Sequence, residues 1–334
     1  MILGWIAEAQ QAGARLATAC RVVGLTARTI ERWRSGAADD LRCGPRTTPK
    51  NALTAVEESQ VVMVLTSSRY RGLSPKQLVP QLADEGLYLA SESTIYRIQR
   101  RKGLRRIKRV IERTRIANST SVHRATGPNQ VWSWDITWLP TTVRGQYLHL
   151  YLVMDVWSRR IVGWTVATHE SAEIAAQLIT DICSREQIER RRLVLHSDNG
   201  SAMRGRTMVS TLQDLGVIPS FSRPHVADDN PYSESLFRTL KHTPAYPQRS
   251  FTGVDEAQRW VTRFVAWYNA EHRHSSIRYV TPDQRHFGAD REILAARHRL
   301  YQRARSATPA RWSGPTRDWS MIDTVELNPE RSAA

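Results

Sequence analysis

The spacing of hydrophobic residues predicts two short helices near the start of the chain. In residues 15–34, Gly24 lies where a tight turn between the helices would tolerate it, and Thr26 can cap the second helix. The apolar positions are spaced so that both helices would share one core: Ala19, Val23, Leu25, Ile30 and Trp33. This arrangement is typical of a helix-turn-helix unit, and equally of an ordinary helical hairpin.

A second helical pair is expected further along. Ser74 can cap a helix that has Pro75 at its first position, and Gln77 completes a capping box. That helix ends near Gly86, and Ser91 opens another with Ile95 and Ile98 on its apolar side. The sequence therefore predicts two helical units before residue 126.

After Asn129 the pattern changes to short β-rich runs, and then to alternating helices and strands. Strands are expected at 131–139, 147–156, 161–168, 192–197 and 217–222; helices are expected at 171–185 and 207–215 and from Pro231. The first three strands are consecutive and would pair antiparallel, so the central part is a mixed α/β domain.

Charge is concentrated at the N-terminal end. The chain has 334 residues and a formal net charge of +16, of which residues 1–126 contribute +12. Such a charge indicates a polyanionic partner. There is no apolar run of about 18 residues, so no membrane span is expected. The three cysteines are widely spaced and indicate neither disulfides nor zinc, which favours a reducing cytoplasm.

The basic residues suggest which segments would contact DNA phosphates. They lie on the second helix of each unit, and a run from Arg100 to Arg109 continues directly from the last helix. The DNA-contact candidates there are Arg28, Arg32, Arg34, Arg97, Arg100, Arg101, Lys102, Arg105, Arg106, Lys108 and Arg109. A solvated charged face is the alternative interpretation.

Three acidic residues of the central part carry the candidate chemistry. Asp135 lies within a β-rich run, where a carboxylate is costly unless it is paired or binds a metal. Asp198 follows the fourth strand, and Glu234 lies in the first turns of a helix. There are 62 residues between the two aspartates and 35 between Asp198 and Glu234. Taken singly, each could be an ordinary strand, turn or helix-start residue.

Together, these residues resemble the DDE motif of transposases and retroviral integrases. The flanking sequences Trp132–Thr137, His196–Gly200 and Asn230–Lys241 resemble the three signature segments of that family. Residues after the core, including Tyr268-Asn269, also match. Among these proteins the chain is most similar to the OrfB-type transposases of bacterial insertion sequences, the IS-three group.

The resemblance implies a multidomain fold. Helix-turn-helix units at 1–45 and 50–115 would precede a ribonuclease H-like catalytic core at 127–287, with a five-stranded mixed sheet, and a small C-terminal tail at 288–334. It also implies that Asp135, Asp198 and Glu234 are catalytic and hold Mg²⁺, with Mn²⁺ as a substitute and two ions per site.

The reaction so implied is cleavage at insertion-sequence ends, followed by transfer of the freed 3′-hydroxyl to another DNA phosphodiester. The partners would be double-stranded DNA, both the terminal inverted repeats and the target, a homo-oligomer on that DNA, and an OrfA-type partner or fusion. The location would be the bacterial cytoplasm, associated with the nucleoid. A catalytically silent DNA-binding regulator and a ribonuclease H-type nuclease are the alternative functions.

Further residues are candidates for supporting roles. Arg238 and Lys241 follow Glu234 by four and seven positions, so they share its helix face and can meet DNA phosphates. His196 and Asn199 flank Asp198 and would orient it or contact DNA. By contrast Asp155, near the end of the second strand, has no matching motif, and Asp228 and Asp229 are better explained as loop or cap residues. Only His123 lies in the first 126 residues, so a His-His-Cys-Cys zinc module is not supported.

Overall fold

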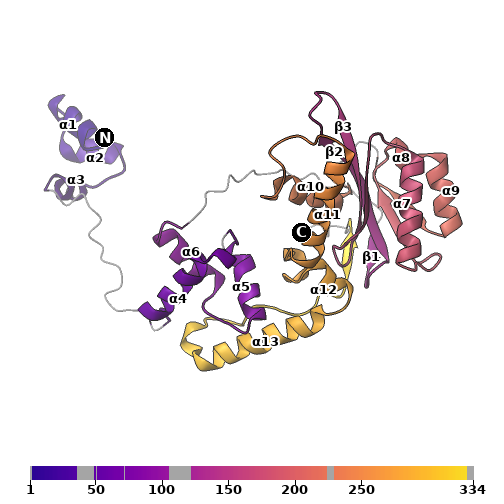
Figure 1. The fold of residues 1–334 in the computed structure, drawn as a ribbon. Helices are drawn as coiled ribbons and strands as arrows, with labels where there is room; N and C mark the ends of the chain where they lie inside the picture. Colours follow the sequence, from indigo (N-terminus) through magenta and orange to yellow (C-terminus); the bar gives the residue numbers. More distant parts are fainter. Residues whose placement is uncertain are drawn as a thin grey trace. The chain divides into compact units, whose positions relative to one another are not determined.

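A computed structural model describes residues 2–35, 49, 51–70, 72–104, 122–223 and 229–328 (Figure 1). The chain divides into two compact units, Met1–Ala52 and Leu53–Ala334. Four of the basic DNA-contact candidates lie outside the described residues: Arg105, Arg106, Lys108 and Arg109. Asp228 also lies outside them. The four-part domain division drawn from the sequence stays a prediction, as does a DNA-binding role for either helical region.

The first unit consists of three short helices, α1 (Ile2–Gln11), α2 (Leu16–Val22) and α3 (Ala27–Arg34). Thr26 caps α3, as expected, because its hydroxyl accepts a hydrogen bond from the Thr29 amide at 3.3 Å. Ile30 is fully buried against Ile6 of α1, a helix that the sequence pattern did not indicate. Val23, expected in this core, is 37% exposed.

Three more helices begin the second unit. They are α4 (Ala55–Thr66), α5 (Pro75–Asp84) and α6 (Glu92–Arg101), with a 3₁₀ turn, η1 (Ser68–Tyr70), after α4. At the start of α5 the Gln77 side-chain oxygen accepts hydrogen bonds from both the amide and the hydroxyl of Ser74, at 3.2 and 3.0 Å. This is the reciprocal arrangement that the Ser-Pro-Lys-Gln sequence predicts.

These helices pack against the C-terminal part of the chain. The long helix α13 (Asp290–Ala307) and Trp312, which follows the 3₁₀ turn η4 (Pro309–Arg311), share a hydrophobic core with them. Tyr88 contacts the rings of Tyr301 and Trp312, with centroid distances of 4.9 and 5.3 Å. Residues of the expected C-terminal tail therefore complete the core of the second helical region, which α4, α5 and α6 alone would leave open to water.

The central sheet has five strands in the order β4-β3-β2-β5-β6. Their bounds are β2 (Val131–Pro140), β3 (Tyr147–Asp155), β4 (Ile161–Ala167), β5 (Val194–Ser197) and β6 (Ile218–Phe221). The first three pair antiparallel, whereas β5 is parallel to both β2 and β6. The expected five-stranded mixed sheet is thus confirmed.

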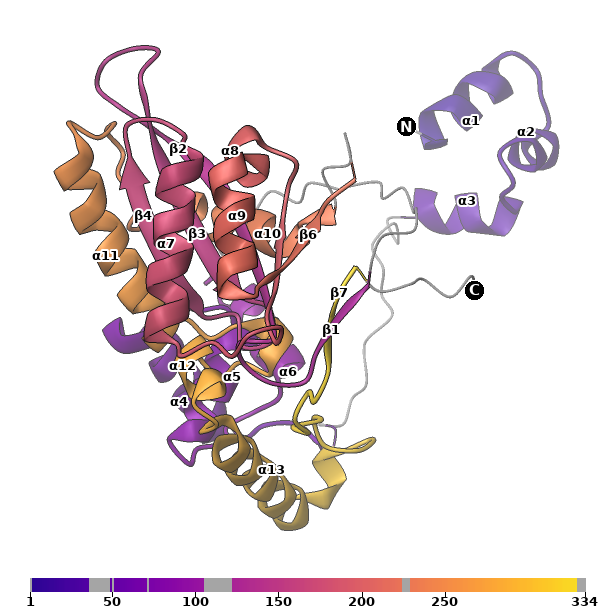
Figure 2. The same ribbon diagram turned by 90° about the vertical axis from the view of Figure 1, so that its right-hand side faces the viewer.

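Helices cover both faces of this sheet (Figure 2). On one face α7 (Ala172–Arg185), the short α8 (Ser201–Arg204) and α9 (Arg206–Leu215) pack on Trp132 and Trp134. On the other face α10 (Pro231–His242) and α11 (Val254–Ala270) pack on Leu139, Leu150 and Leu152. Alternating residues of β2 therefore face different layers, and the odd-numbered ones, which include Asp135, face α10 and α11.

The remaining described elements connect the central sheet domain to the C-terminal part of the chain. Strand β1 (His123–Ala125) pairs antiparallel with β7 (Val325–Leu327), and η3 (Ser275–Ile277) and α12 (Pro282–His286) connect α11 to α13. Within the described residues, no helix combines the length and apolar character needed to cross a membrane.

An ion pair with a buried arginine also links α5 to α13, and Arg273 pairs with the same aspartate. Arg297 is fully buried, and its guanidinium binds both carboxylate oxygens of Asp84, at 2.5 and 2.9 Å. The same guanidinium also donates to the carbonyls of Arg278 and Tyr279. Removing one partner from such a pair leaves an uncompensated buried charge.

We predict that Asp84→Asn lowers the free energy of unfolding by about 3 kcal/mol, measured by urea denaturation with circular dichroism. Glu189→Gln is the matched control, because Glu189 pairs with Arg192 where both side chains are more than two-thirds exposed. This control should change stability by less than about 0.5 kcal/mol. Equal, small effects of both variants would mean that Asp84 does not hold Arg297 in place.

Candidate active site

Two of the three candidate carboxylates come from neighbouring parallel strands. In the β2–β5 ladder Val131 pairs with Val194 and Ser133 with His196, a constant offset of 63 positions. Extending this offset by two residues brings Asp198, just after β5, opposite Asp135 in the middle of β2. The spacing read from the sequence thus corresponds to two adjacent positions across the sheet.

The third carboxylate lies on a helix that is fastened to the same strand. The Ser133 hydroxyl of β2 hydrogen-bonds the Ser233 hydroxyl at 2.6 Å and the Asn230 side-chain oxygen at 2.5 Å. The Asn230 amide in turn donates to the carbonyl of Trp134 at 3.2 Å. All these groups are buried. They hold the first turn of α10, and with it Glu234, on the face of β2 from which Asp135 projects.

Burial and neighbouring charge disfavour ionisation of Asp135. Its pKa is raised to about 7, first by desolvation and then by the negative charges of Asp198, Glu234 and Glu170. A backbone hydrogen bond from the Ile136 amide, at 2.8 Å, opposes this shift only partly. Asp198, Glu234 and Glu170 therefore each lie close enough to Asp135 to disfavour its charge, which is costly without a cation.

The donor set suits a hard divalent cation, because Mg²⁺ prefers carboxylate oxygens and is usually held by few of them. In the part of the chain that the structure describes, however, no three His, Cys, Asp or Glu side chains are gathered as ligands around one point. The backbone thus brings the three carboxylate residues near one another, but their side chains do not surround a common metal position.

Asp198 is held by a neighbour that the sequence analysis did not identify. Ser222, one residue after β6, donates its hydroxyl to Asp198 Oδ1 at 2.8 Å. The Asn199 side-chain amide donates to the Ser222 carbonyl, and the buried Asn199 Oδ1 atom has no hydrogen-bond partner among the described residues. Ser222 belongs to none of the three signature segments, so only the β5–β6 pairing could reveal it.

His196 is a buried link between strands. Burial lowers its pKa, so the ring is neutral near pH 7. Its Nε2 lies 3.0 Å from the Asp229 carbonyl, which can only accept, so Nε2 carries the proton and Nδ1 accepts from Ser220 at 2.9 Å. The Asn328 amide donates to the same Asp229 carbonyl at 2.9 Å. His196 thus ties β5 to Asp229, two residues before the start of α10.

The acidic residues set aside in the sequence have structural partners. Arg223 binds Asp229 through two side-chain contacts of 2.9 and 3.0 Å and lowers the pKa of its carboxyl group. Asp155 is fully buried in the β3–β4 turn, where it accepts hydrogen bonds from the hydroxyl and amide of Ser158 and from the Asn129 amide.

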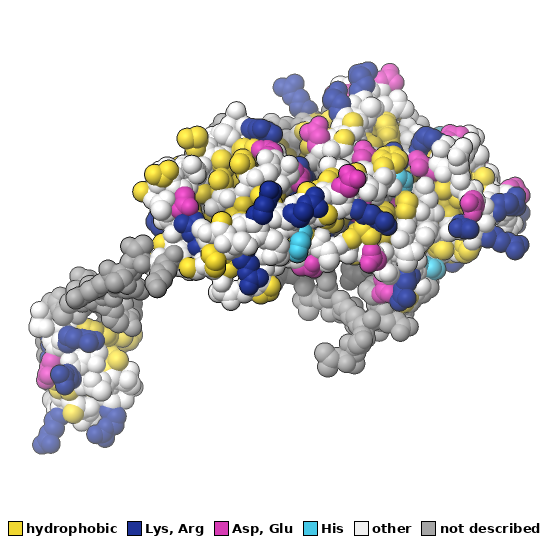
Figure 3. All heavy atoms as spheres, turned by 90° about the horizontal axis from the view of Figure 1, so that it is seen from below, with side chains coloured by type: hydrophobic (Ala, Val, Ile, Leu, Met, Phe, Trp, Pro, Cys, Tyr) yellow, Lys and Arg dark blue, Asp and Glu magenta, His cyan; other side chains and the backbone are white. Residues whose placement is uncertain are grey.

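The described basic candidates are exposed. These residues are Arg28, Arg32, Arg34, Arg97, Arg100, Arg101, Lys102, Arg238 and Lys241. Arg101 and Lys102 form ion pairs with Glu58, and Arg34 hydrogen-bonds Gln10. In the view of Figure 3, Lys and Arg side chains are interspersed with Asp and Glu over the surface.

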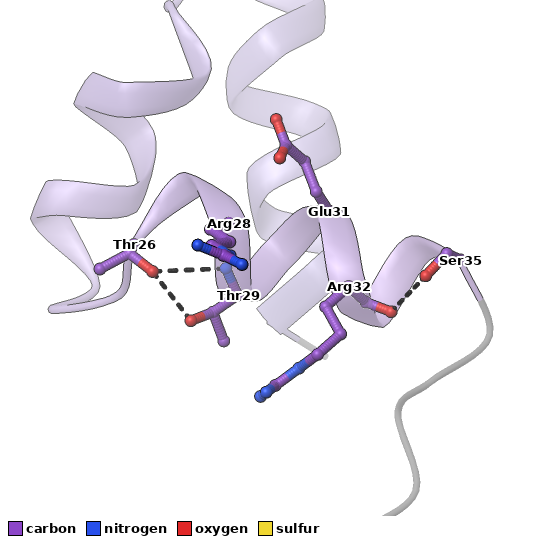
Figure 4. Close-up of a pocket in the computed structure, with 6 residues that line it drawn as sticks. All are labelled: Thr26, Arg28, Thr29, Glu31, Arg32 and Ser35. Atoms are coloured by element: carbon purple, nitrogen blue, oxygen red, sulfur yellow. Dashed lines mark hydrogen bonds between the residues drawn. The ribbon is translucent and has the colours of Figure 1, made fainter.

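Helix α3 presents a shallow depression on its exposed side (Figure 4). Arg28 and Arg32 line it, together with Thr26, Thr29, Glu31 and Ser35. The two arginines are one helical turn apart, and both are exposed. This surface combines cationic and hydroxyl groups, which are common phosphate contacts, with one acidic side chain.

Comparison with known families identifies the central domain. One integrase core domain family matches residues 125–227, and a second integrase core domain family matches residues 215–282. The first match contains Asp135 and Asp198, and the second contains Glu234.

Known proteins with similar sequences are transposases. The transposase of insertion sequence element IS904 from Lactococcus lactis is 29% identical over 197 residues, 59% of this chain and 74% of that protein. Transposase InsF of insertion sequence IS3A from Escherichia coli is 29% identical over 161 residues, 48% of this chain and 54% of InsF. The chain therefore spans about half the length of InsF.

Among solved structures, the catalytic core domain of BIV integrase is similar over 49% of this chain and 97% of that domain, with 20% identity and a TM-score of 0.37. Residues 125–282 thus match integrase core domains, and the chain is similar to transposases of the insertion sequences IS904 and IS3A, which indicates an enzyme of the polynucleotidyl transferase class.

Proposed function

We propose that this chain cleaves DNA at the ends of an insertion sequence and joins the freed 3′-hydroxyl to another DNA phosphodiester. The observation that supports this most is the 63-residue offset of the β2–β5 ladder, which makes Asp135 and Asp198 neighbours. The hydrogen bond between Ser133 and Ser233 fastens α10 to β2, which brings Glu234 to the face of β2 that carries Asp135. The similar proteins from Lactococcus lactis and Escherichia coli are named transposases, which agrees with this activity.

Asp135, Asp198 and Glu234 would hold divalent ions, Mg²⁺ or Mn²⁺ and two per site. The chemistry that bound ions would supply there is activation of the attacking oxygen and stabilisation of the leaving oxygen of an in-line displacement. The chain itself keeps the carboxylates in position: Ser222 orients Asp198 by its hydrogen bond, and the Ser133–Ser233 contact fixes the helix of Glu234. His196 and Asn199 act as positioning residues through Asp229 and Ser222.

DNA would be bound by basic residues outside this centre. Arg238 and Lys241 are exposed on the same helix as Glu234, so they can meet phosphates next to the carboxylates. Helix α3, which lies far from the three carboxylates in the sequence, would bind double-stranded DNA through Arg28, Arg32 and Arg34. Because two DNA ends must be joined to one target, we also propose that the chain acts as a homo-oligomer on DNA. An OrfA-type partner or fusion, and association with the bacterial nucleoid, are further parts of the proposal.

We predict that Asp135→Asn, Asp198→Asn and Glu234→Gln each reduce cleavage and joining of element-end DNA at least 1,000-fold, while DNA affinity stays within about twofold. The assay is gel analysis of labelled DNA carrying the terminal repeats, with Mg²⁺. Normal joining by any of these variants would overturn the site. Wild-type protein that binds but never cleaves would favour the silent regulator, and cleavage of RNA–DNA hybrids alone would favour the nuclease.

The raised pKa of Asp135 predicts how stability depends on pH. The folded-state pKa of about 7 exceeds the ordinary value of 3.8, so the folded chain binds the extra proton more tightly than the unfolded chain. Without divalent cations, stability should therefore fall as pH rises from about 4 to about 7, and the loss is complete above that.

Asp135→Asn removes this cost, because its side chain cannot ionise. We predict that it raises the free energy of unfolding at pH 8 by on the order of 2 kcal/mol in EDTA, and by less at pH 5.5. Asp214→Asn, a change at an exposed aspartate of α9, should alter stability little at either pH. A destabilising effect of Asp135→Asn at pH 8 would show that its charge is not penalised in the fold.

The double variant Arg28→Ala/Arg32→Ala should weaken binding to double-stranded DNA about tenfold and reduce the slope of log K against log salt by about two. Fluorescence anisotropy at several salt concentrations measures both quantities. Arg299→Ala/Arg303→Ala removes two exposed arginines at the same spacing from α13 and is the matched control. Identical slopes for the two variants would exclude α3 as a phosphate-binding helix.

A further inference from the structure

An exposed aromatic pair lies at the far end of the strand that carries Asp135. Trp138 of β2 is 55% exposed and Tyr147 of β3 is 44% exposed. Their ring centroids are 5.4 Å apart. Nearer the start of β2, on the same face, Trp134 stacks on Tyr151 and is buried. The aromatic stripe thus continues past the sheet region that the helices cover and emerges into solvent.

The indole of Trp138 is held in place although it is exposed. Its Nε1 donates to Glu170 Oε1 at 3.0 Å, and the same oxygen contacts His149 Nδ1 at 3.1 Å. His149 is the direct cross-strand partner of Trp138 in the β2–β3 ladder. The ring is therefore fixed by its polar edge, which leaves apolar ring surface open to solvent.

The hairpin that carries this pair is anchored on the domain. Thr142 donates its amide to the Phe251 carbonyl, and the Phe251 amide donates to the Pro140 carbonyl, both at 3.0 Å. Arg144 at the tip is exposed. The tip residues, Thr-Thr-Val-Arg-Gly-Gln, are mostly polar, which is unlike the apolar centre of a protein–protein interface.

The position along the strand relates this surface to the carboxylates. Trp138 follows Asp135 by three residues, about 10 Å at the rise of a β-strand. Within the described residues, the ladder between β2 and β5 ends at the pair of Ser133 and His196. Both residues therefore lie on the part of β2 beyond its ladder with β5, with Asp135 on the face of α10 and Trp138 on the face of α7.

We propose that Trp138, with Tyr147, is a stacking platform for an unpaired DNA base next to the phosphodiester that the proposed reaction cleaves or joins. This rests on the proposed function. The occupant is a base because the open surface is aromatic and rigid and lies about 10 Å along β2 from Asp135, within the length of a nucleotide or two, with Arg144 on the same hairpin to meet a phosphate. Stacking requires no particular base, so this contact would sense an unpaired nucleotide rather than a sequence.

The experiment uses the full chain and two DNA probes of one sequence without divalent cations: a duplex, and a duplex with a three-nucleotide 3′ overhang that contains 2-aminopurine. Wild-type protein should bind the overhang probe more tightly and quench its 2-aminopurine fluorescence. Trp138→Ala should lose about tenfold in affinity for the overhang probe and most of the quenching, while duplex affinity changes less than twofold. Trp138→Phe should keep most of both.

Phe287→Ala is the matched control, because Phe287 is 70% exposed and lies away from the hairpin in the chain. It should leave both affinities and the quenching unchanged. The proposal is overturned if Trp138→Ala leaves quenching intact, weakens both probes equally, or instead changes the oligomeric state in size-exclusion chromatography, which would indicate a second copy as the occupant. Because no catalysis is measured, a failure of strand transfer would not alter these outcomes.

Discussion

The central physical constraint is the closeness of carboxylates across two parallel strands. The β2–β5 register brings Asp198 opposite Asp135, and Glu234 and Glu170 add further negative charge. Burial strengthens their repulsion, which raises the pKa of Asp135 to about 7. A fold has no stability reason to gather such groups. The arrangement is explained if a cation and a phosphate are to be held there.

The surrounding structure opposes this repulsion with neutral hydrogen bonds. Ser133, Ser233 and Asn230 lock helix α10 to β2, and Ser222 holds Asp198. His196 joins β5 to the Asp229 carbonyl, to which Asn328 near the C-terminal end also donates. Because these partners are uncharged, they fix the positions of the acids without neutralising them. The site therefore keeps its negative potential while its geometry is set by buried contacts.

Much of the catalytic domain follows from sequence periodicity, since β-rich runs and amphipathic helices have local signatures. The three carboxylates were singled out by their resemblance, with their flanking segments, to the DDE motif, and the strand register places two of them in neighbouring positions. Ser222, however, has no local signature, because its role comes from a strand that is adjacent only in the folded sheet. The packing of α4, α5 and α6 on α13 was also missed. It joins Asp84 to Arg297 across more than 200 residues, and no periodicity reports such a contact.

The central claim is that Asp135, Asp198 and Glu234 form one divalent-metal centre. The most direct measurement is anomalous diffraction from crystals of the wild-type chain soaked in MnCl₂. The account predicts an anomalous peak between the Asp135 and Asp198 carboxylates, within coordination distance of both, which disappears in Asp198→Asn. Manganese bound elsewhere in the domain, with these carboxylates free of metal in crystals of active protein, would contradict it.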